Sequence, residues 1–387
     1  MLRPLGREVG APTSAPRRPK RGGVLLAILL PGFPQFLGGR ILVGGFALLL
    51  WASFVGIGSI RWERVVAAPG GGWDERAALL TLLCGLMAIW TWSIRDATLG
   101  SGVARTDGSW ARFAREFGRN RVASIGLGAV GISYLAALLA PFLAPFDPAF
   151  QGDLVVGRLS APSGAHLLGT DQFARDVFSR LLYGARVSLS IGFIAVAISM
   201  TIGTLVGAVA GFLGGWWDAA IMRFVDMVIS FPRLVLLITV IALFEPSLFV
   251  LVVLLGLTQW PLPARIVRGE VLSLREREFM VAGRALGFRA PRLIFRHLIP
   301  NTLAPVTVAA TLGIGDTIIL EAGLSFLGLG IQPPTPSWGT MVADGRNHLL
   351  GAWWVTTFPG LAIVLVVLSF NLAGDGLRDA LDPRLRR

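Results

Sequence analysis

The chain has 387 residues, of which 54% are hydrophobic and only 15% charged, and its net charge is +12. Soluble globular proteins carry roughly 25% charged residues, so this composition excludes an ordinary soluble domain and indicates an integral membrane protein. The positive charge lies in arginine-rich stretches between apolar runs, a pattern that membrane proteins show at their cytoplasmic loops and that argues against a nucleic-acid partner.

Residues that bind metals or nucleotides are scarce and scattered. Cys84 is the single cysteine, which excludes an internal disulfide and a thiolate cluster. The histidines, which fall in no metal-ligand spacing, are His166, His297 and His348. Lys20, the only lysine, precedes an arginine, so the chain lacks the Gly-Lys-Ser/Thr of a nucleotide-binding loop. We therefore expect no metal, no cofactor and no enzymatic activity here, and any ATP to be bound by another chain.

The first third of the chain is predicted to precede the main domain. Residues 1–22 are rich in Pro and Arg and are typical of a disordered, basic cytoplasmic tail. Apolar segments at 24–57 and 77–94 predict an extra transmembrane hairpin of two helices within residues 23–97. The following linker, residues 98–121, is dense in arginine and is predicted to be cytoplasmic.

Residues 122–387 are predicted to form one transmembrane domain. Its six apolar runs, each long enough for a bilayer span, are 122–145, 187–212, 222–244, 247–265, 302–329 and 355–373. With the hairpin, the count is eight spans. The arginine distribution places both termini in the cytoplasm and the connections 146–186 and 330–354 outside. Prolines such as Pro232 are expected to kink or end helices near the membrane faces.

The connection 146–186 is polar and irregular. Within it, the stretch Arg175 to Arg186 has apolar residues at helical spacing and predicts an amphipathic helix at the membrane surface, supported by a pair between Asp176 and Arg180. Asp171 and Asp176 could be taken for catalytic carboxylates. No nucleophile, base or metal ligand is arranged with them in a catalytic pattern, so a structural role is expected.

The stretch 275–301 is charged and amphipathic, although apolar runs flank it on both sides. An arginine at the bilayer centre costs at least about 2.5–3.5 kcal/mol on insertion scales, so this stretch is a loop at a membrane face. Its pattern predicts two short helices. Gly287 suits the left-handed position that ends the first helix, and Pro291 suits the first turn of the second.

Small residues mark one side of the first predicted helix. Ala282, Gly283 and Ala285 leave that side bare, so the backbone of another protein could approach it closely. The loop resembles the EAA loop of ABC-transporter permeases, which docks into a groove on a cytoplasmic ATPase. That pattern is Glu-Ala-Ala, three residues, Gly, nine residues, Ile, one residue, Leu-Pro. The coupling residues that the resemblance predicts here are Val281, Ala282, Gly283, Arg284, Gly287, His297 and Pro300.

Three of these positions depart from the pattern. Val281 lacks the acidic group, which puts one docking contact in doubt, and Gly283 replaces an alanine. His297 stands at the Ile position, and this resembles the Arg-His-Leu-x-Pro-Asn variant of the dipeptide/oligopeptide/nickel permease family. The resemblance continues through motifs in the order of that family, namely Leu168-Gly169-Thr170-Asp171, Arg175-Asp176-Val177, Leu324–Gly330, Pro333–Gly339 and Gly374–Asp379.

The resemblance implies an all-α integral membrane protein with the transmembrane helix bundle of a type I ABC importer permease (MetI-like). It further implies a multi-pass protein of the cell inner membrane, surrounded by lipid, that forms half of a translocation pathway. The implied partners are a second permease subunit, cytoplasmic ATP-binding subunits and an extracytoplasmic solute-binding protein. Peptides, nickel chelates and similar small solutes all stay open as substrates.

Two acidic residues, Asp316 and Glu321, lie within the predicted span 302–329 and are functional candidates on that ground. They are about 140° apart around a helix and cannot form a paired site on one face. Glu321 and Ser325 share a face. Glu321 either bonds a neighbouring helix beside the pathway or clasps two permease halves together. The alternative function is an ion-coupled secondary transporter that uses Asp316 and Glu321, although no inverted repeat is visible.

Overall fold

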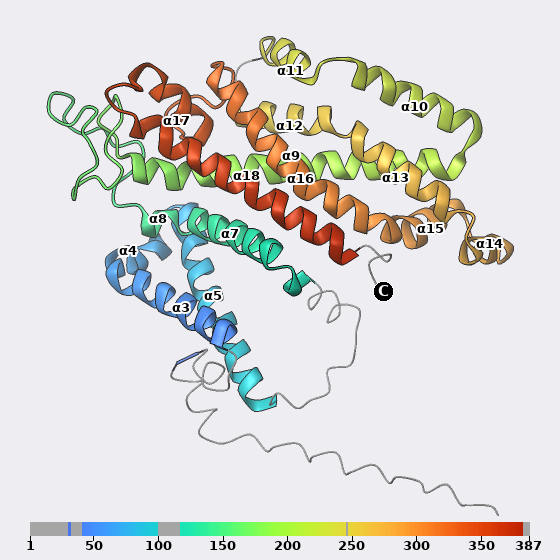
Figure 1. Cartoon of the computed structure of the whole chain (residues 1–387), viewed down its shortest axis with the longest axis horizontal. Coiled ribbons are helices and arrows are strands. Elements are labelled where there is room, and N and C mark those ends of the chain that lie inside the picture. Colours follow the sequence, from blue (N-terminus) through green and yellow to red (C-terminus); the bar gives the residue numbers. More distant parts are fainter. Residues whose placement is uncertain (1–29, 32–40, 100–116, 245–246, 382–387) are drawn as a thin grey trace, which may run out of the picture. The chain divides into compact units, whose positions relative to one another are not determined.

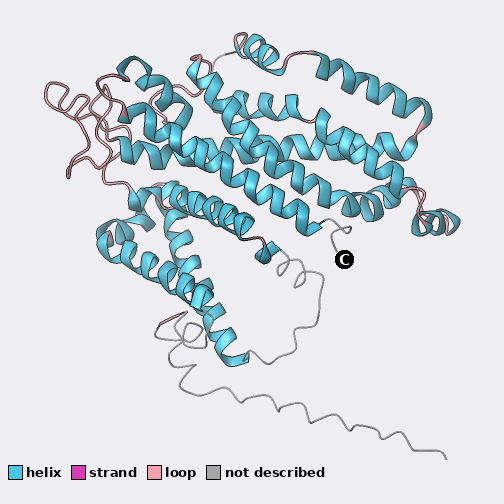
Figure 2. Ribbon diagram, viewed as in Figure 1, coloured by secondary structure: helices cyan, strands magenta, loops and turns pink. Residues whose placement is uncertain are grey.

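The computed structural model describes residues 30–31, 41–99, 117–244 and 247–381 (Figure 1). The regular structure of these residues is helical (Figure 2), apart from one isolated β-bridge between Thr170 and Asp176. The prediction of an all-α protein is thereby confirmed. The predicted tail and most of the predicted linker lie outside the described residues. The chain divides into two compact units, Met1–Gly108 and Ser109–Arg387, which are described separately.

The described part of the first unit holds two long helices, α3 (Ile41–Ile60) and α5 (Trp73–Leu99), joined by α4 (Trp62–Ala67) and the short η1 (Ala68–Gly70). The two long helices contact each other. The ring of Phe54 packs so closely on Gly85 that an added Cβ there would lie 2.7 Å from the ring. This pairing is what the hairpin prediction requires. Within the described residues α3 contributes only the shorter apolar segment Leu50–Ile60, and a membrane-spanning hairpin stays a prediction.

The second unit is a helical bundle. Its helical segments that are long and apolar enough to cross a membrane are α7 (Arg121–Leu138), α9 (Val177–Leu213), α12 with α13 (Leu248–Gln259, Pro261–Leu274), α15 to α16 (Ala290–Phe326) and α18 (Trp354–Leu381). The bent pair α10 (Gly215–Ser230) and α11 (Arg233–Ile241) would make a sixth. The described residues therefore hold five or six spans, against the eight predicted for the whole chain.

The predicted span 222–244 is wrong as a single straight helix. Helix α10 starts at Gly215, between the predicted spans 187–212 and 222–244. The axes of α10 and α11 are bent by 78°. The break falls at Phe231, whose backbone is extended (φ −80°, ψ 128°), directly before Pro232. Proline disfavours the helical conformation of the residue before it and provides no N–H donor, so the helix ends there. The expectation that Pro232 ends a helix is confirmed.

The predicted surface helix from Arg175 to Arg186 is also wrong as a separate element. These residues start the 37-residue helix α9. Asp176 caps that helix by accepting a hydrogen bond of 2.8 Å from the Ser179 N–H. The predicted pair of Asp176 with Arg180 does not form, because Arg180 contacts Asp171 and Asp344 instead. A helix of this length is about 55 Å long and exceeds the roughly 30 Å hydrocarbon core.

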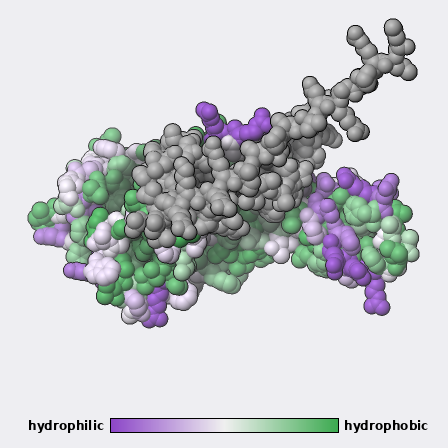
Figure 3. Space-filling model, turned by 90° about the horizontal axis from the view of Figure 1, so that it is seen from below, coloured by the Kyte–Doolittle hydropathy of each residue, from purple (hydrophilic) through white to green (hydrophobic). Residues whose placement is uncertain are grey.

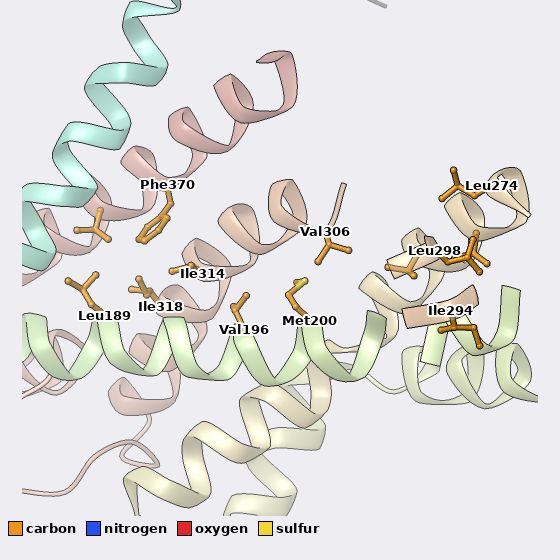
Figure 4. Close-up of a cluster of buried hydrophobic side chains, with 14 of the residues drawn as sticks. Leu189, Val196, Met200, Leu274, Ile294, Leu298, Val306, Ile314, Ile318 and Phe370 are labelled. Carbon is orange, nitrogen blue, oxygen red and sulfur yellow. The ribbon is translucent and has the colours of Figure 1, made fainter. Parts of the chain in front are cut away.

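Helix α9 is the centre of the bundle and contacts α7, α12, α13 and α16. Figure 4 shows Leu189, Val196 and Met200 of α9 facing Ile314 and Ile318 of α16 within the main apolar cluster. Towards the other end of α9, small residues let α13 approach. A Cβ added to Gly203 would lie 2.7 Å from the Trp260 carbonyl oxygen.

Candidate functional site

The loop 275–301 contains the predicted helix pair, α14 (Glu278–Ala285) and α15 (Ala290–Leu293). Gly287 has φ +72° and ends α14. The Phe288 N–H donates to the Gly283 carbonyl (3.0 Å) and the Gly287 N–H donates to the Arg284 carbonyl (2.9 Å), which is a complete Schellman motif. Pro291 stands in the first turn of α15. Both sequence-based assignments, the helix-ending glycine and the helix-starting proline, are confirmed.

Gly283 does not lie on a bare outer face, and that part of the prediction is wrong. It is buried, and a Cβ added there would lie 3.0 Å from Cδ2 of Leu293 and 3.4 Å from Cδ2 of Phe288. Its missing side chain therefore lets α15 pack on α14 within the loop. Ala282 and Ala285 are exposed as expected. The small outer face is limited to these two residues.

Large apolar side chains surround these two alanines. On and beside α14, Phe279, Val281 and Leu286 are 41%, 55% and 72% exposed. Met280 is fully buried in the main apolar cluster, so the helix that presents these side chains is anchored. We call Phe279, Val281, Ala282, Arg284, Ala285 and Leu286 the α14 surface. Figure 3 shows hydrophobic and hydrophilic residues side by side at its right-hand end, where Figure 1 places α14.

The arginines of this loop face outward. Arg277, Arg284, Arg289, Arg292 and Arg296 are exposed, and none of them forms an ion pair within the described residues. A few contact aromatic rings instead. The guanidinium of Arg292 lies 4.0 Å from the centre of the Phe288 ring, and that of Arg284 lies 5.8 Å from the Phe212 ring. The loop thus presents positive charge around an apolar patch.

His297 and Pro300 do not belong to the α14 surface. His297 lies in the π-helical segment η2 (Ile294–Leu298), and its ring stacks on Phe288 with 6.0 Å between centres and 15° between planes. Its Nε2 is buried and has no hydrogen-bond partner in the described residues. Pro300 stands in the first turn of α16 (Ile299–Phe326). The π segment leads the loop directly into that helix.

Glu321 is completely buried and is held by three serines of the same chain. Its carboxylate accepts hydrogen bonds from the hydroxyls of Ser325 (2.7 Å), Ser337 (3.0 Å) and Ser188 (3.5 Å). Ser188 belongs to α9, and Ser337 caps α17 (Trp338–Gly345). Glu321 therefore clasps α9, α16 and α17 within one chain. The predicted bond to a neighbouring helix is therefore present, because Ser188 belongs to α9. A clasp between two permease halves does not fit this burial.

Asp316 lies elsewhere on α16. It is exposed and lines a cavity beside α11 and α12, together with Arg233. The structure does not bring Asp316 and Glu321 together, which confirms that they form no paired carboxylate site.

The structure also assembles a charged cluster that the sequence analysis missed, formed by Asp171, Arg175, Arg180 and Asp344. The Arg175 Nε donates to Asp171 Oδ2 (2.7 Å), and the Nη2 atoms of Arg175 and Arg180 lie 3.4 and 3.3 Å from Asp344 Oδ2. Burial raises the pKa of Asp344 above its ordinary value, and the two guanidiniums oppose that rise. Buried arginines require nearby carboxylates, but no local pattern identifies Asp344, 164 residues from Arg180.

Comparison with known proteins gives two family matches. Residues 203–387 match the family described as the binding-protein-dependent transport system inner membrane component. Residues 108–162 match the family described as the N-terminal TM domain of oligopeptide transport permease C.

Individual relatives agree with these matches. A dipeptide transport system permease protein of Alkalihalophilus pseudofirmus is 43% identical over 277 residues, 72% of this chain and 90% of that protein. A di/tripeptide transport system permease protein of Pseudomonas aeruginosa is 42% identical over 278 residues, 71% of this chain and 92% of that protein. A glutathione transport system permease protein of Pectobacterium atrosepticum is 42% identical over 279 residues, 72% of this chain and 92% of that protein.

Proposed function

The chain belongs to the family of binding-protein-dependent transport system inner membrane components, and from this membership we propose that it forms half of a pathway for short peptides and docks its ATPase at the α14 surface. It is a multi-pass permease subunit of an ATP-driven importer. The names of the three relatives, for dipeptides, di/tripeptides and glutathione, share one substrate chemistry, a short peptide.

The observation that carries the docking proposal is the character of the α14 surface. Its loop joins two spans, and its exposed arginines keep it out of lipid. Large apolar side chains are nevertheless exposed there, among them Leu286 at 72%. An apolar patch with a charged rim, on an anchored helix, is the chemistry of a protein–protein interface. A cytoplasmic ATPase is the partner that an importer permease needs at that place.

The remaining assignments follow from the same proposal. The ATPase side holds the linker 98–121, the loop 275–301 and both termini, so 146–186 and 330–354 face the solute-binding protein in a cell inner membrane. A second permease subunit completes the pathway. Within the proposed division into 1–22, 23–97, 98–121 and 122–387, the hairpin 23–97 is an addition to the permease domain, and ATP hydrolysis belongs to the separate ATPase chains.

An ion-coupled secondary transporter is the less favoured function. Its only support is the presence of Asp316 and Glu321 in α16. The hydrogen bonds of Glu321 to three serines give it a structural task. The relatives are named as permease proteins of transport systems, which favours the importer.

The test is Ala282→Trp, which adds a large side chain to an exposed position of the α14 surface. The matched control is Ala161→Trp, also exposed but in the connection 146–186. Each variant is expressed with the ATPase, the second permease and the binding protein. We expect both to reach the membrane at normal levels.

Ala282→Trp should lower ATPase co-purification roughly tenfold or more, as the loss of an interface hot spot of about 2 kcal/mol would do. Peptide-stimulated ATP hydrolysis should fall with it, while Ala161→Trp retains both. Full ATPase association in Ala282→Trp would show that the ATPase docks elsewhere.

A further inference from the structure

A cavity of about 350 Å³ lies where the α10–α11 bend meets α12, α13 and α16. It falls within the range of roughly 300–1,000 Å³ that is typical of small-molecule sites. Its wall includes Pro232, Arg233, Gln259 and Asp316. Gln259 ends α12, near the middle of the span Leu248–Leu274, so the cavity lies at membrane depth. Charged side chains at such a depth are costly and mark functional sites.

Arg233 has only neutral partners in this wall. Its Nη2 donates to the Leu255 carbonyl (3.1 Å) and Gln259 Oε1 (3.4 Å), and its Nε donates to Thr258 Oγ1 (3.3 Å). Within residues 117–244 and 247–381, no carboxylate lies within ion-pair distance of its guanidinium. These bonds fix the guanidinium at the cavity. The carboxylate that acts on its charge is Asp316, which lies beyond ion-pair distance.

Asp316 carries the opposite charge on the same cavity. In the part of the chain that the structure describes, it forms neither a hydrogen bond nor an ion pair. Its neighbour Thr317 donates to Gln259 Oε1 (2.9 Å), and Gln259 Nε2 donates to the Gly313 carbonyl (3.4 Å). These bonds tie α16 to α12 and hold the wall in place. Asp316 is left exposed, next to a network that does not use it.

We propose that this cavity is a transit site for a zwitterionic ligand, in which Arg233 binds the terminal carboxylate and Asp316 binds the terminal ammonium of a short peptide. The proposal rests on the proposed function, because it names how that pathway recognises its substrate. A zwitterion pairs both protein charges and brings no net charge into the membrane. Guanidinium groups suit carboxylates because two parallel N–H donors match the two oxygens.

The first experiment measures uptake of radiolabelled dialanine by the assembled importer in proteoliposomes. Asp316→Asn and Arg233→Gln should each lower uptake about tenfold or more, since each removes a charge-assisted hydrogen bond to the ligand. The ATPase should co-purify normally with both variants. The matched control is Asp226→Asn, which removes an exposed carboxylate of α10 that contacts Arg265 and does not line the cavity.

The second experiment detects occupancy without relying on transport rates. In a Cys84→Ala background, Leu262→Cys places a thiol on the cavity wall, and Leu257→Cys places one on α12 outside it. The native side chains are 62% and 46% exposed. Dialanine should slow thiol labelling at position 262 but not at position 257. Adding Asp316→Asn should remove this protection.

The outcomes separate the two proposals. Normal uptake in Asp316→Asn, or equal labelling at position 262 with and without dialanine, overturns the transit site and leaves the permease assignment intact. A position 262 that is never labelled in the assembled importer shows that the second permease fills the cavity, and this also overturns it. If the unaltered importer neither takes up dialanine nor retains its ATPase, the proposed function fails as well.

Discussion

The two ends of the bundle differ in how their arginines are buried and paired. At the α17 end, formed by residues 146–180 and 330–354, Arg175 and Arg180 are buried among carboxylates and only 4% and 3% exposed, whereas Arg158 and Arg346 are exposed. At the α14 end, residues 275–298, five arginines are exposed, and none of them forms an ion pair among the described residues. The first end thus holds a buried cluster of opposite charges, whereas the second exposes its arginines beside apolar side chains, as the proposed docking requires.

The difference has energetic consequences that can be measured. A buried ion pair contributes little over an apolar substitute, but the loss of one partner leaves an uncompensated charge and is strongly destabilising. An exposed charge is screened by water, so its loss changes stability little. Substitutions at the α17 end should therefore act on the stability of the whole bundle. Those at the α14 end should act locally and on assembly.

The largest effect is expected for Asp171→Ala. This change removes the carboxylate that faces both Arg175 and Arg180, and breaking such a buried pair costs about 3–5 kcal/mol. The free energy of unfolding of the detergent-solubilised chain should fall by that amount. Asp153→Ala, an exposed aspartate of the same connection, should cost less than about 1 kcal/mol. Equal losses for the two aspartates would show that burial among the arginines adds nothing to the contribution of Asp171.

The second effect concerns Glu321→Ala, which leaves three serine hydroxyls without their shared acceptor. Buried polar groups without partners cost about 1–3 kcal/mol each, and because hydroxyls can rotate to other acceptors we expect a total of about 2–3 kcal/mol. Glu321→Gln keeps an acceptor oxygen at nearly the same volume and should lose less than half of that. The free energy of unfolding of the detergent-solubilised chain, measured for both variants, tests these values. A Glu321→Ala variant with the same free energy of unfolding as the wild type would mean that these hydrogen bonds do not hold α17 to the bundle.

Local chemistry explains what could be predicted from the sequence. The helix pair of the α14 end follows from two residues whose backbone preferences act within one turn, Gly287 and Pro291. The break at Pro232 follows in the same way, although its 78° angle does not, because packing of α11 on α12 sets the direction. The apolar spans were recognisable because each spanning helix must form its own backbone hydrogen bonds within the bilayer, independently of distant residues.

Long-range contacts explain what could not be predicted. The pattern of small residues predicts that Gly283 and Ala282 lie on the same exposed face. In the structure Gly283 is buried instead, because it packs against Leu293 and Phe288. Asp344 could not be paired with Arg175 or Arg180 before α17 and α9 were placed side by side. The same holds for the meeting of Glu321 with Ser188, 133 residues earlier.

A smaller effect is expected at the α14 end, for Gly287→Val. A non-glycine residue in the left-handed conformation costs about 1–2 kcal/mol, so opening of the loop should rise roughly tenfold. Trypsin should then cleave at the arginines of the loop about tenfold faster, because cleavage follows the open population. Gly287→Asn should lie between, since asparagine tolerates this conformation. The global unfolding free energy should hardly change in either variant. Cleavage of Gly287→Val at the wild-type rate would contradict a helix end held by this glycine.

The smallest effect concerns Asp344 at the α17 end and is a change in how the free energy of unfolding depends on pH. Burial raises the pKa of Asp344 above its ordinary value of 3.8, although Arg180 and Arg175 act against this rise. Over the range between the two values, the folded chain holds a proton that the unfolded chain has released. Stability therefore falls as pH rises from about 3.8 through the raised pKa.

Asp344→Asn should remove this contribution, so the stability of the variant relative to the wild type should increase with pH over that range. The weakened contacts with Arg175 and Arg180 should add a loss of stability that does not depend on pH. Thermal unfolding at a series of pH values measures the difference. A pH-independent difference for Asp344→Asn would mean that burial does not set the protonation of this carboxyl, and the contrast between the two ends would then be limited to Asp171, Arg175 and Arg180.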